Sequence, residues 1–257
     1  MYRLDPPVES WVLDLDGVVW LAGRLIPGAP EAVMRLRDSG ARVIFATNNS
    51  SPPIGVLEAR LASLGMSAVG DVVTSAQAAA SMLEPGMSAM ACAGPGVVEA
   101  LEARGVEVVT EGRPDAVVVG FHTDFDYERL RVAHRAVDGG ARLIGANDDP
   151  TYPTPAGPTP GGGAILAAVA TAAGVAPEIA GKPYAPMADL VRSMLGEGRI
   201  AVVGDRASTD GRLARMLQGD FVLVLSGVTG PDDLPTDPVA DLVCADLRAV
   251  ADAVTGP

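Results

Sequence analysis

The sequence predicts an α/β fold in which a doubly wound parallel sheet carries a second α/β domain inserted into it. Short, β-prone apolar runs alternate with stretches of helical periodicity, which favours parallel strands connected by helices. A middle block repeats this alternation over about 100 residues, a usual size for a domain. We therefore divide the chain into a main domain, 1–75 and 179–257, and an inserted domain, 76–178.

The composition indicates a globular protein that does not bind nucleic acid. Of the 257 residues 48% are hydrophobic, and 19 Lys and Arg stand against 32 Asp and Glu, a net charge of −13. Nucleic-acid binding requires basic side chains, so this balance argues against it. Cys92 and Cys244 lie far apart, as expected of free thiols in a reducing cytosol. Neither a signal peptide nor a membrane span is recognisable, so we expect a cytoplasmic protein.

The stretch 11–20, WVLDLDGVVW, places two carboxylates directly after an apolar run. Residues 11–13 are expected to form a buried strand, from which Asp14 and Asp16 would begin on the same side. Two carboxylates this close repel each other unless a cation or a proton lies between them. An Asp pair before glycine is also common in turns. Its position at the carboxyl end of the first strand nevertheless favours a metal or phosphoryl-transfer site.

The following elements place polar side chains at a second strand end. A helix is predicted over 30–40 and a strand over 42–46, which leads into Thr47-Asn48-Asn49-Ser50. Two prolines and a helix ending at residue 64 follow, so the polar run occupies a strand–turn–helix junction with free N–H groups. Such a junction can cap its helix or hold an anion, and four consecutive polar residues favour the anion.

The rest of the chain continues the alternation. The inserted block is predicted to contain helices over 72–83, 95–104 and 126–137, and strands over 87–92, 106–109, 116–120 and 142–146. The tract 147–163 is crowded with Pro and Gly and is predicted to be an ordered connector without packed elements. After it we expect helices over 164–173, 187–195 and 211–217, strands over 199–203 and 221–225, and a strand–helix pair over 242–254.

Four groups of polar residues end strands or begin helices, and in a doubly wound sheet their loops would open at the same edge. Together they provide what phosphoryl transfer needs: a nucleophile, an acid, ligands for a cation, and donors for the phosphoryl oxygens. The groups are Asp14/Asp16, Thr47/Asn48, Lys182 and Asp205/Asp210.

The chain resembles a phosphatase of the haloacid dehalogenase superfamily, in the NagD-like branch (para-nitrophenylphosphatase/phosphoglycolate phosphatase) with a large α/β cap. The resemblance covers nearly the whole chain and implies a Rossmann-like core with the cap inserted. It is carried by DLDGVVW at 14–20, TNNS at 47–50, GANDDPTYPTPAGPTPGGG at 145–163, GKP at 181–183 and GDRASTD at 204–210.

The resemblance assigns a role to each motif residue. Asp14 would attack phosphorus and form an aspartyl phosphate. Asp16 would protonate the leaving alkoxide and later take a proton from the hydrolytic water. Thr47 and Asn48 would donate hydrogen bonds to the phosphate, and Lys182 would offset the charge of the carboxylates and the transferring group.

The resemblance also implies Mg²⁺ as the cofactor. Its ligands would be Asp14, the backbone carbonyl of Asp16, and Asp205, because Mg²⁺ prefers oxygen ligands in an octahedron. Asp210 would lie at or just outside this ligand set.

Simpler roles remain open for several of these residues. Lys182 could be a solvated loop lysine, and Asp210 could be an acidic residue favoured in the first turn of a helix. In the cap, His122 and Asp149 are candidates for contacting the substrate. A solvated loop histidine is the alternative for His122.

The predicted function is Mg²⁺-dependent hydrolysis of a small phosphorylated metabolite. A polar cap loop and an aromatic content of only 4% favour a short polyol or hydroxy-acid phosphate, such as glycerol phosphate or phosphoglycolate, over a stacked base. Nucleotides, pyridoxal phosphate and phosphotransferase activity remain alternatives, and a homodimer formed through the cap is left open.

A phosphoaspartate receiver is disfavoured because the Asp pair lies on the first strand. A catalytically silent binding protein is disfavoured because both Asp14 and Asp16 are present.

Overall fold

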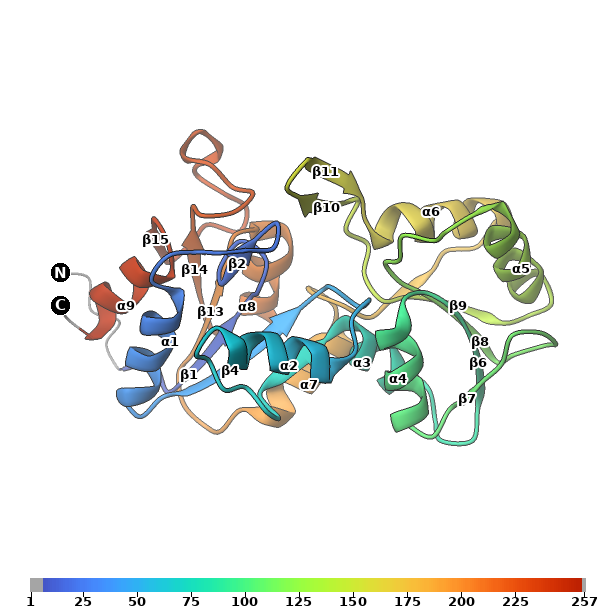
Figure 1. Cartoon of the computed structure of the whole chain (residues 1–257), viewed down its shortest axis with the longest axis horizontal. Coiled ribbons are helices and arrows are strands. Elements are labelled where there is room, and N and C mark those ends of the chain that lie inside the picture. Colours follow the sequence, from blue (N-terminus) through green and yellow to red (C-terminus); the bar gives the residue numbers. More distant parts are fainter. Residues whose placement is uncertain (1–6, 256–257) are drawn as a thin grey trace.

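Residues 7–255 are described by a computed structural model, and they form two lobes built on separate parallel sheets (Figure 1). The first sheet is parallel throughout, with its strands in the order β15-β14-β13-β1-β4-β5. These strands are β1 (Ser10–Leu13), β4 (Arg42–Thr47), β5 (Val72–Thr74), β13 (Ile200–Gly204), β14 (Asp220–Val224) and β15 (Leu242–Cys244). The predicted doubly wound parallel sheet is therefore confirmed.

The strand order reverses direction at β1, which lies between β4 and β13. Leu13, the last residue of β1, is aligned with Phe45 of β4 and Val203 of β13. The loops that follow these three strands therefore leave the sheet at the same edge. Open parallel sheets bind ligands at such a reversal of strand order.

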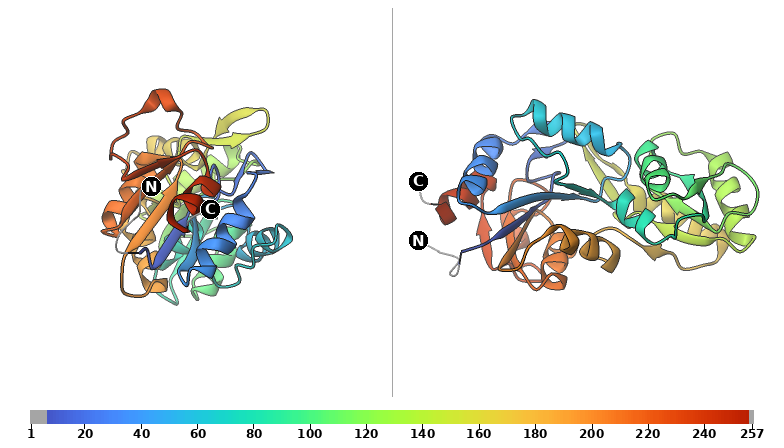
Figure 2. Two further views of the ribbon diagram at one scale, coloured as in Figure 1. Left: turned by 90° about the vertical axis from the view of Figure 1, so that its left-hand side faces the viewer. Right: turned by 90° about the horizontal axis from the view of Figure 1, so that it is seen from below.

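Alternate side chains of the sheet enter two apolar clusters. Trp11 and Leu13 pack with helices α1 (Ala29–Asp38), α2 (Ile54–Ser63) and α9 (Leu247–Thr255). Val12 points to the opposite face, where α7 (Ala185–Met194) and α8 (Arg212–Met216) lie. The right-hand view of Figure 2 shows these two helix layers on either side of the sheet.

The second sheet, also parallel, has the strand order β12-β9-β8-β6-β7. One face packs on α3 (Ser75–Ser81) and α4 (Pro95–Ala103), and the other on α5 (Tyr127–Asp138) and α6 (Gly162–Ala173). Its strands are β6 (Ser88–Cys92), β7 (Glu107–Val108), β8 (Ala116–Val119), β9 (Arg142–Gly145) and β12 (Glu178–Ile179). Because β12 spans residues 178 and 179, it lies across the domain boundary that the sequence predicts; the boundaries themselves stay a prediction.

Two predicted segments differ from the structure. The helix expected over 72–83 begins only at Ser75, because the β-branched Val72, Val73 and Thr74 form the edge strand β5. Thr74 then caps α3 in a capping box with Gln77. The connector contains an antiparallel hairpin, β10 (Thr151–Thr154) and β11 (Gly157–Pro160), so the expectation of no packed element there was wrong.

Smaller elements complete the described chain. A second hairpin, β2 (Trp20–Leu21) and β3 (Arg24–Leu25), follows the first Asp motif. The helix expected over 211–217 is preceded by a π-helical turn, η1 (Ala207–Gly211), and a 3₁₀ turn, η2 (Pro231–Asp233), follows β14. Within residues 7–255 no helix combines the length and the apolar character needed to cross a bilayer.

Candidate active site

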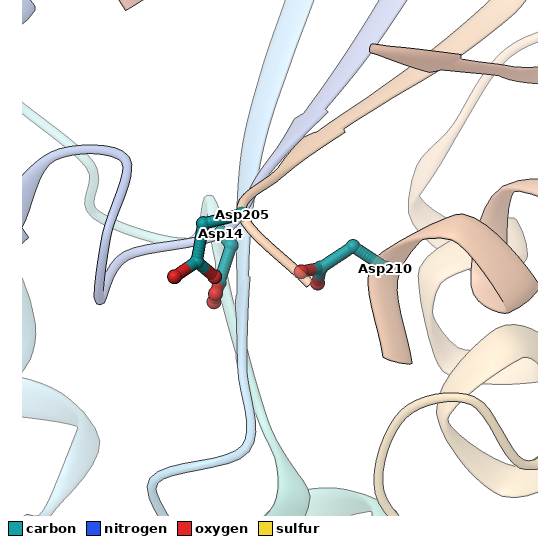
Figure 3. A group of neighbouring side chains, drawn as sticks. All are labelled: Asp14, Asp205 and Asp210. Carbon is teal, nitrogen blue, oxygen red and sulfur yellow. The ribbon is translucent and has the colours of Figure 1, made fainter. Parts of the chain in front are cut away.

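Three carboxylates from separate elements meet at the edge of the first sheet where the strand order reverses. Asp14 follows β1, Asp205 follows β13, and Asp210 lies in η1. Figure 3 shows the three side chains converging, and one oxygen of each lies within 4.8 Å of the others. The sequence predicted this convergence from the positions of the motifs.

Lys182 is buried between two of these carboxylates. Its Nζ lies 2.7 Å from Asp14 Oδ1 and 2.6 Å from Asp210 Oδ1, and its side chain is only 2% exposed. Burial alone would lower the pKa of Lys182, but the two carboxylates outweigh burial and raise it above its ordinary value. Lys182 is therefore a buried cation of the site, and the alternative of a solvated loop lysine is wrong.

The remaining carboxylate charge makes the cluster a fitting site for a hard cation. Burial raises the pKa of Asp14 well above its usual range, against the lowering effect of Lys182, and raises the pKa of Asp205 to about 6. A cation would remove this penalty by stabilising the charged carboxylates. Gly17, at φ +90°, is needed beside them, because a Cβ there would overlap the Asp205 carboxylate.

Asp210 is held more firmly by protein donors than the other two carboxylates. Its Oδ1 accepts from Lys182 Nζ and its Oδ2 from the backbone N–H of Arg206 at 3.2 Å. Asp205 Oδ2 accepts from the N–H of Val228 at 2.6 Å. Asp14 Oδ2 and Asp205 Oδ1 have no protein donor among the described residues, so these two oxygens are the most available to a cation.

Asp16 occupies a different environment from Asp14. Its Oδ1 accepts hydrogen bonds from Trp20 Nε1 at 3.2 Å and from the Tyr152 hydroxyl at 3.5 Å. Burial raises the pKa of Asp16 to about 6, although Arg60 and the Trp20 bond act to lower it. Its carboxylate lies outside the three-carboxylate cluster. The two acids of the motif therefore have separate partners and can perform separate functions.

In the polar run after β4, Thr47 faces the catalytic cavity, whereas the side chain of Asn48 makes hydrogen bonds to other parts of the protein. Thr47 is buried and lines the cavity, and its Oγ1 accepts from the N–H of Asn49. The Asn48 amide donates to Asp149 Oδ2 at 2.9 Å and to the Lys182 carbonyl at 3.1 Å, and its Oδ1 accepts from the Lys182 N–H at 2.7 Å. The side chain of Asn48 is therefore committed to holding Lys182 and Asp149 in place.

The two cap candidates have different surroundings. Asp149 lines the catalytic cavity, and burial raises its pKa against the lowering effect of the Asn48 hydrogen bond. His122 is only 5% exposed, with Nδ1 2.8 Å from Asp124 Oδ1 and Nε2 3.9 Å from Cys92 Sγ. The alternative of a solvated loop histidine is wrong, because this loop folds inward against β6. His122 is also absent from the walls of the cavity.

The sequence did not single out the aromatic wall of the site. Phe121 and Tyr152 stack with ring centroids 4.8 Å apart and line a cavity of about 70 Å³. Tyr152 comes from β10, and its hydroxyl accepts from Asn49 Nδ2 at 3.2 Å. The only available signal was a tyrosine among the prolines of the connector, which does not indicate where the hairpin would fold.

Comparisons with known proteins agree with this geometry. The profile of haloacid dehalogenase-like hydrolases matches residues 11–107, and a second profile, HAD-hydrolase-like, matches 179–250. A D-glycerol 3-phosphate phosphatase of Mycobacterium tuberculosis is 38% identical over 88% of this chain, which spans 65% of that relative's length. An acid sugar phosphatase of Staphylococcus saprophyticus is 32% identical, over 88% of this chain and 90% of the relative.

Solved structures show the same relationship. A glycerol phosphate phosphatase from Mycobacterium tuberculosis in complex with magnesium superposes with a TM-score of 0.89 at 32% identity, covering 97% of this chain and 78% of that one. Matches over 88% and 97% of the chain must include most of the inserted sheet as well as the first sheet. The chain belongs to the haloacid dehalogenase-like hydrolases.

Proposed function

We propose that the protein is a Mg²⁺-dependent phosphomonoesterase that hydrolyses small phosphorylated metabolites through an aspartyl phosphate. The observation that carries this proposal is the separation of the Asp pair within one cavity. Asp14 contacts Lys182 and the other carboxylates, whereas Asp16 contacts Trp20 and Tyr152. Once a cation offsets the neighbouring carboxylates, the first environment suits an ionised nucleophile, and the second suits a group that exchanges a proton.

In the first half of the reaction, an oxygen of Asp14 bonds to phosphorus and the bond from phosphorus to the alkoxy oxygen breaks. Asp16 gives its proton to that oxygen, so the alcohol leaves neutral. In the second half, Asp16 takes a proton from water as the water oxygen bonds to phosphorus. The acyl phosphate bond then breaks, which restores Asp14 and releases inorganic phosphate.

The other side chains stabilise charge in both halves. Thr47 and the backbone after β4 donate to the phosphoryl oxygens, and Lys182 provides a fixed positive charge. Asp14, Asp205 and the Asp16 carbonyl would hold Mg²⁺, with Asp210 beside them positioning Lys182. The bound cation supplies positive charge that offsets the repulsion between the carboxylates and the phosphate dianion.

The proposed substrates are short polyol or hydroxy-acid phosphates. The catalytic cavity is small, about 70 Å³, and Phe121 and Tyr152 already stack on each other. Relatives named as glycerol 3-phosphate and acid sugar phosphatases support this class. We propose that the protein works in the cytoplasm as a single chain or a cap-mediated homodimer, without nucleic acid. Nucleotides, pyridoxal phosphate and phosphoryl acceptors other than water are the competing options.

The test is phosphate release from a panel of phosphorylated metabolites and p-nitrophenyl phosphate, with Mg²⁺ and with chelator. We expect turnover only with Mg²⁺, its loss in Asp14→Asn, and higher kcat/KM for three-carbon and two-carbon phosphates than for nucleotides. Equal activity with chelator, or full activity of Asp14→Asn, would overturn the proposal. Preference for nucleotides would overturn only the substrate class.

A further inference from the structure

A second cavity of about 320 Å³ adjoins the catalytic cavity on the side of Asp16. The two cavities share five lining residues: Asp16, Thr47, Asn49, Phe121 and Tyr152. Asp14, Lys182 and Asp205 line only the first. The second cavity therefore lies beside Asp16, the proposed proton donor, and away from the nucleophile Asp14.

This arrangement indicates where the leaving group lies, if the proposed function holds. In phosphoryl transfer the attacking and leaving oxygens are roughly in line, on opposite sides of phosphorus. The leaving oxygen must also come within hydrogen-bond reach of its proton donor. A phosphate attacked by Asp14 and protonated from Asp16 thus directs its organic part into the second cavity.

Arg60 is the cation that lines this second cavity within residues 7–255. Its guanidinium lies 4.0 Å from the centroid of the Trp20 ring, and one nitrogen donates to the Gly23 carbonyl at 3.0 Å. Trp20 in turn donates to Asp16, so the same indole ring contacts both the guanidinium and the acid proposed as proton donor. Stacking and one hydrogen bond fix the position of Arg60.

Arg60 has donors left over and forms no direct ion pair with an acidic side chain of the described residues, although it acts on Asp16 electrostatically. A guanidinium has five N–H donors, and none of the ion pairs in the described part of the chain involves Arg60. Arg37 also lies near an aromatic ring, with its guanidinium 6.0 Å from the Phe45 ring centroid, but unlike Arg60 it forms an ion pair, with Asp71. A half-buried, pre-positioned guanidinium that faces a cavity is suited to bind a carboxylate in a fork geometry.

We propose that Arg60 is a specificity-determining residue that binds a carboxylate on the leaving group, so that phosphates of short hydroxy acids are preferred over those of neutral polyols. The proposal rests on the proposed function and selects between its two substrate types. It also explains how a chain of net charge −13 accepts a substrate with a second anionic group.

The test compares kcat/KM for 2-phosphoglycolate and 3-phosphoglycerate with kcat/KM for glycerol 3-phosphate. Effects of Arg60 that act through Asp16 are common to all substrates and cancel in this ratio. We expect Arg60→Gln to lower the acid-to-polyol ratio by about 10- to 100-fold, the range for a hydrogen bond to a charged group. Arg60→Lys should retain part of the preference, and Arg37→Gln should leave the ratio unchanged.

A measurement on the unmodified protein tests the same inference without relying on a variant that could misfold. Glycolate should inhibit p-nitrophenyl phosphate hydrolysis at lower concentration than ethylene glycol does, because only glycolate has a carboxylate for Arg60. An acid-to-polyol ratio within about twofold of the parent in Arg60→Gln, or equal inhibition by the two alcohols, would overturn the inference. Hydrolysis of p-nitrophenyl phosphate in the same experiments would show that the phosphatase function itself still stands.

Discussion

Asp16 and Asp14 differ only in their neighbours, and this difference leads to a kinetic prediction. In Asp16→Asn, alkyl phosphates should be hydrolysed about 10²- to 10⁴-fold more slowly, the contribution of a general acid–base. p-Nitrophenolate leaves without a proton, so with p-nitrophenyl phosphate the first step should survive and the second should stall. We expect a burst of one p-nitrophenolate per enzyme and an Asp14 phosphoryl adduct detectable by mass spectrometry. An unchanged steady-state rate would contradict the assignment of Asp16.

The raised pKa values in the carboxylate cluster couple stability, pH and metal. Burial raises the pKa of Asp205 to about 6 and that of Asp14 well above its usual range. Without metal, the folded state binds protons more tightly than the unfolded chain, whose Asp pKa is about 3.9. The stability contributed by Asp205 is therefore complete below about pH 4 and is lost as pH rises through about 6, and the raised pKa of Asp14 acts in the same direction.

We therefore expect Mg²⁺ to raise the melting temperature more at pH 7.5 than at pH 5, where it competes with protons for the same oxygens. The measurement is thermal unfolding with chelator and with saturating Mg²⁺ at both pH values. Asp205→Asn should reduce the Mg²⁺ effect at pH 7.5 more than Asp210→Asn does, because both Asp210 oxygens already accept protein hydrogen bonds. Equal shifts at the two pH values would refute this linkage.

Site residues could be predicted from the sequence where a motif fixes both position and chemistry. Asp14, Asp205, Asp210 and Lys182 follow buried strands or open helices, so the topology brings them together. The surroundings of Asn48 could not be predicted, because its partner Asp149 is distant in the sequence. The sequence also does not indicate that His122 is buried, because burial depends on how its loop packs against β6, where Cys92 lies.

Helices and strands were best predicted where periodicity extends over a long segment. The helix expected over 126–137 is observed at Tyr127–Asp138, with Asp126 accepting from Arg129 N as its N-cap. Two-residue strands such as β2 and β12 have no periodicity to detect. The strands β10 and β11 contain three prolines, which argue against a strand unless it lies at an edge. A two-stranded ribbon consists only of edges, so it can accommodate them.

Helix α2 receives its N-terminal cap from the inserted lobe, which is the lobe built on the second sheet. Pro53 occupies the N-cap position without a side-chain hydrogen bond, and Glu99 of α4 accepts from the N–H of Ile54 at 3.0 Å. An uncapped helix N-terminus leaves N–H groups unsatisfied. Glu99 therefore connects the two lobes through a specific polar contact.

We expect Glu99→Ala to lower the free energy of unfolding by about 0.5–2 kcal/mol, as for loss of an N-cap acceptor. Glu99→Gln keeps an acceptor oxygen and should recover most of this. Glu102→Ala is the matched control, since Glu102 lies exposed on the same helix. Urea unfolding of the four proteins provides the measurement. If Glu99→Ala and Glu102→Ala were equally stable, the cap would contribute nothing.

The two lobes are connected by a continuous apolar cluster. It includes Val12 and Val202 of the first sheet, and Val118 and Ile144 of the second. Helix α3 lies between the two sheets and packs on α4 of the inserted lobe and on α7 of the first lobe. Its buried face consists of small side chains. Apolar burial is the main favourable contribution to folding, so loss of either lobe would expose part of the cluster to water.

This shared cluster predicts that the lobes unfold together. The chain has two tryptophans, and both Trp11 and Trp20 are buried in the cluster of the first sheet. Tryptophan fluorescence therefore reports the first lobe, whereas far-UV circular dichroism reports the helices and strands of both. With Mg²⁺ present, the two urea curves should coincide, as for a cooperative transition. If circular dichroism showed an earlier transition that fluorescence did not detect, the inserted lobe would unfold independently, and the cluster would be two weakly coupled cores.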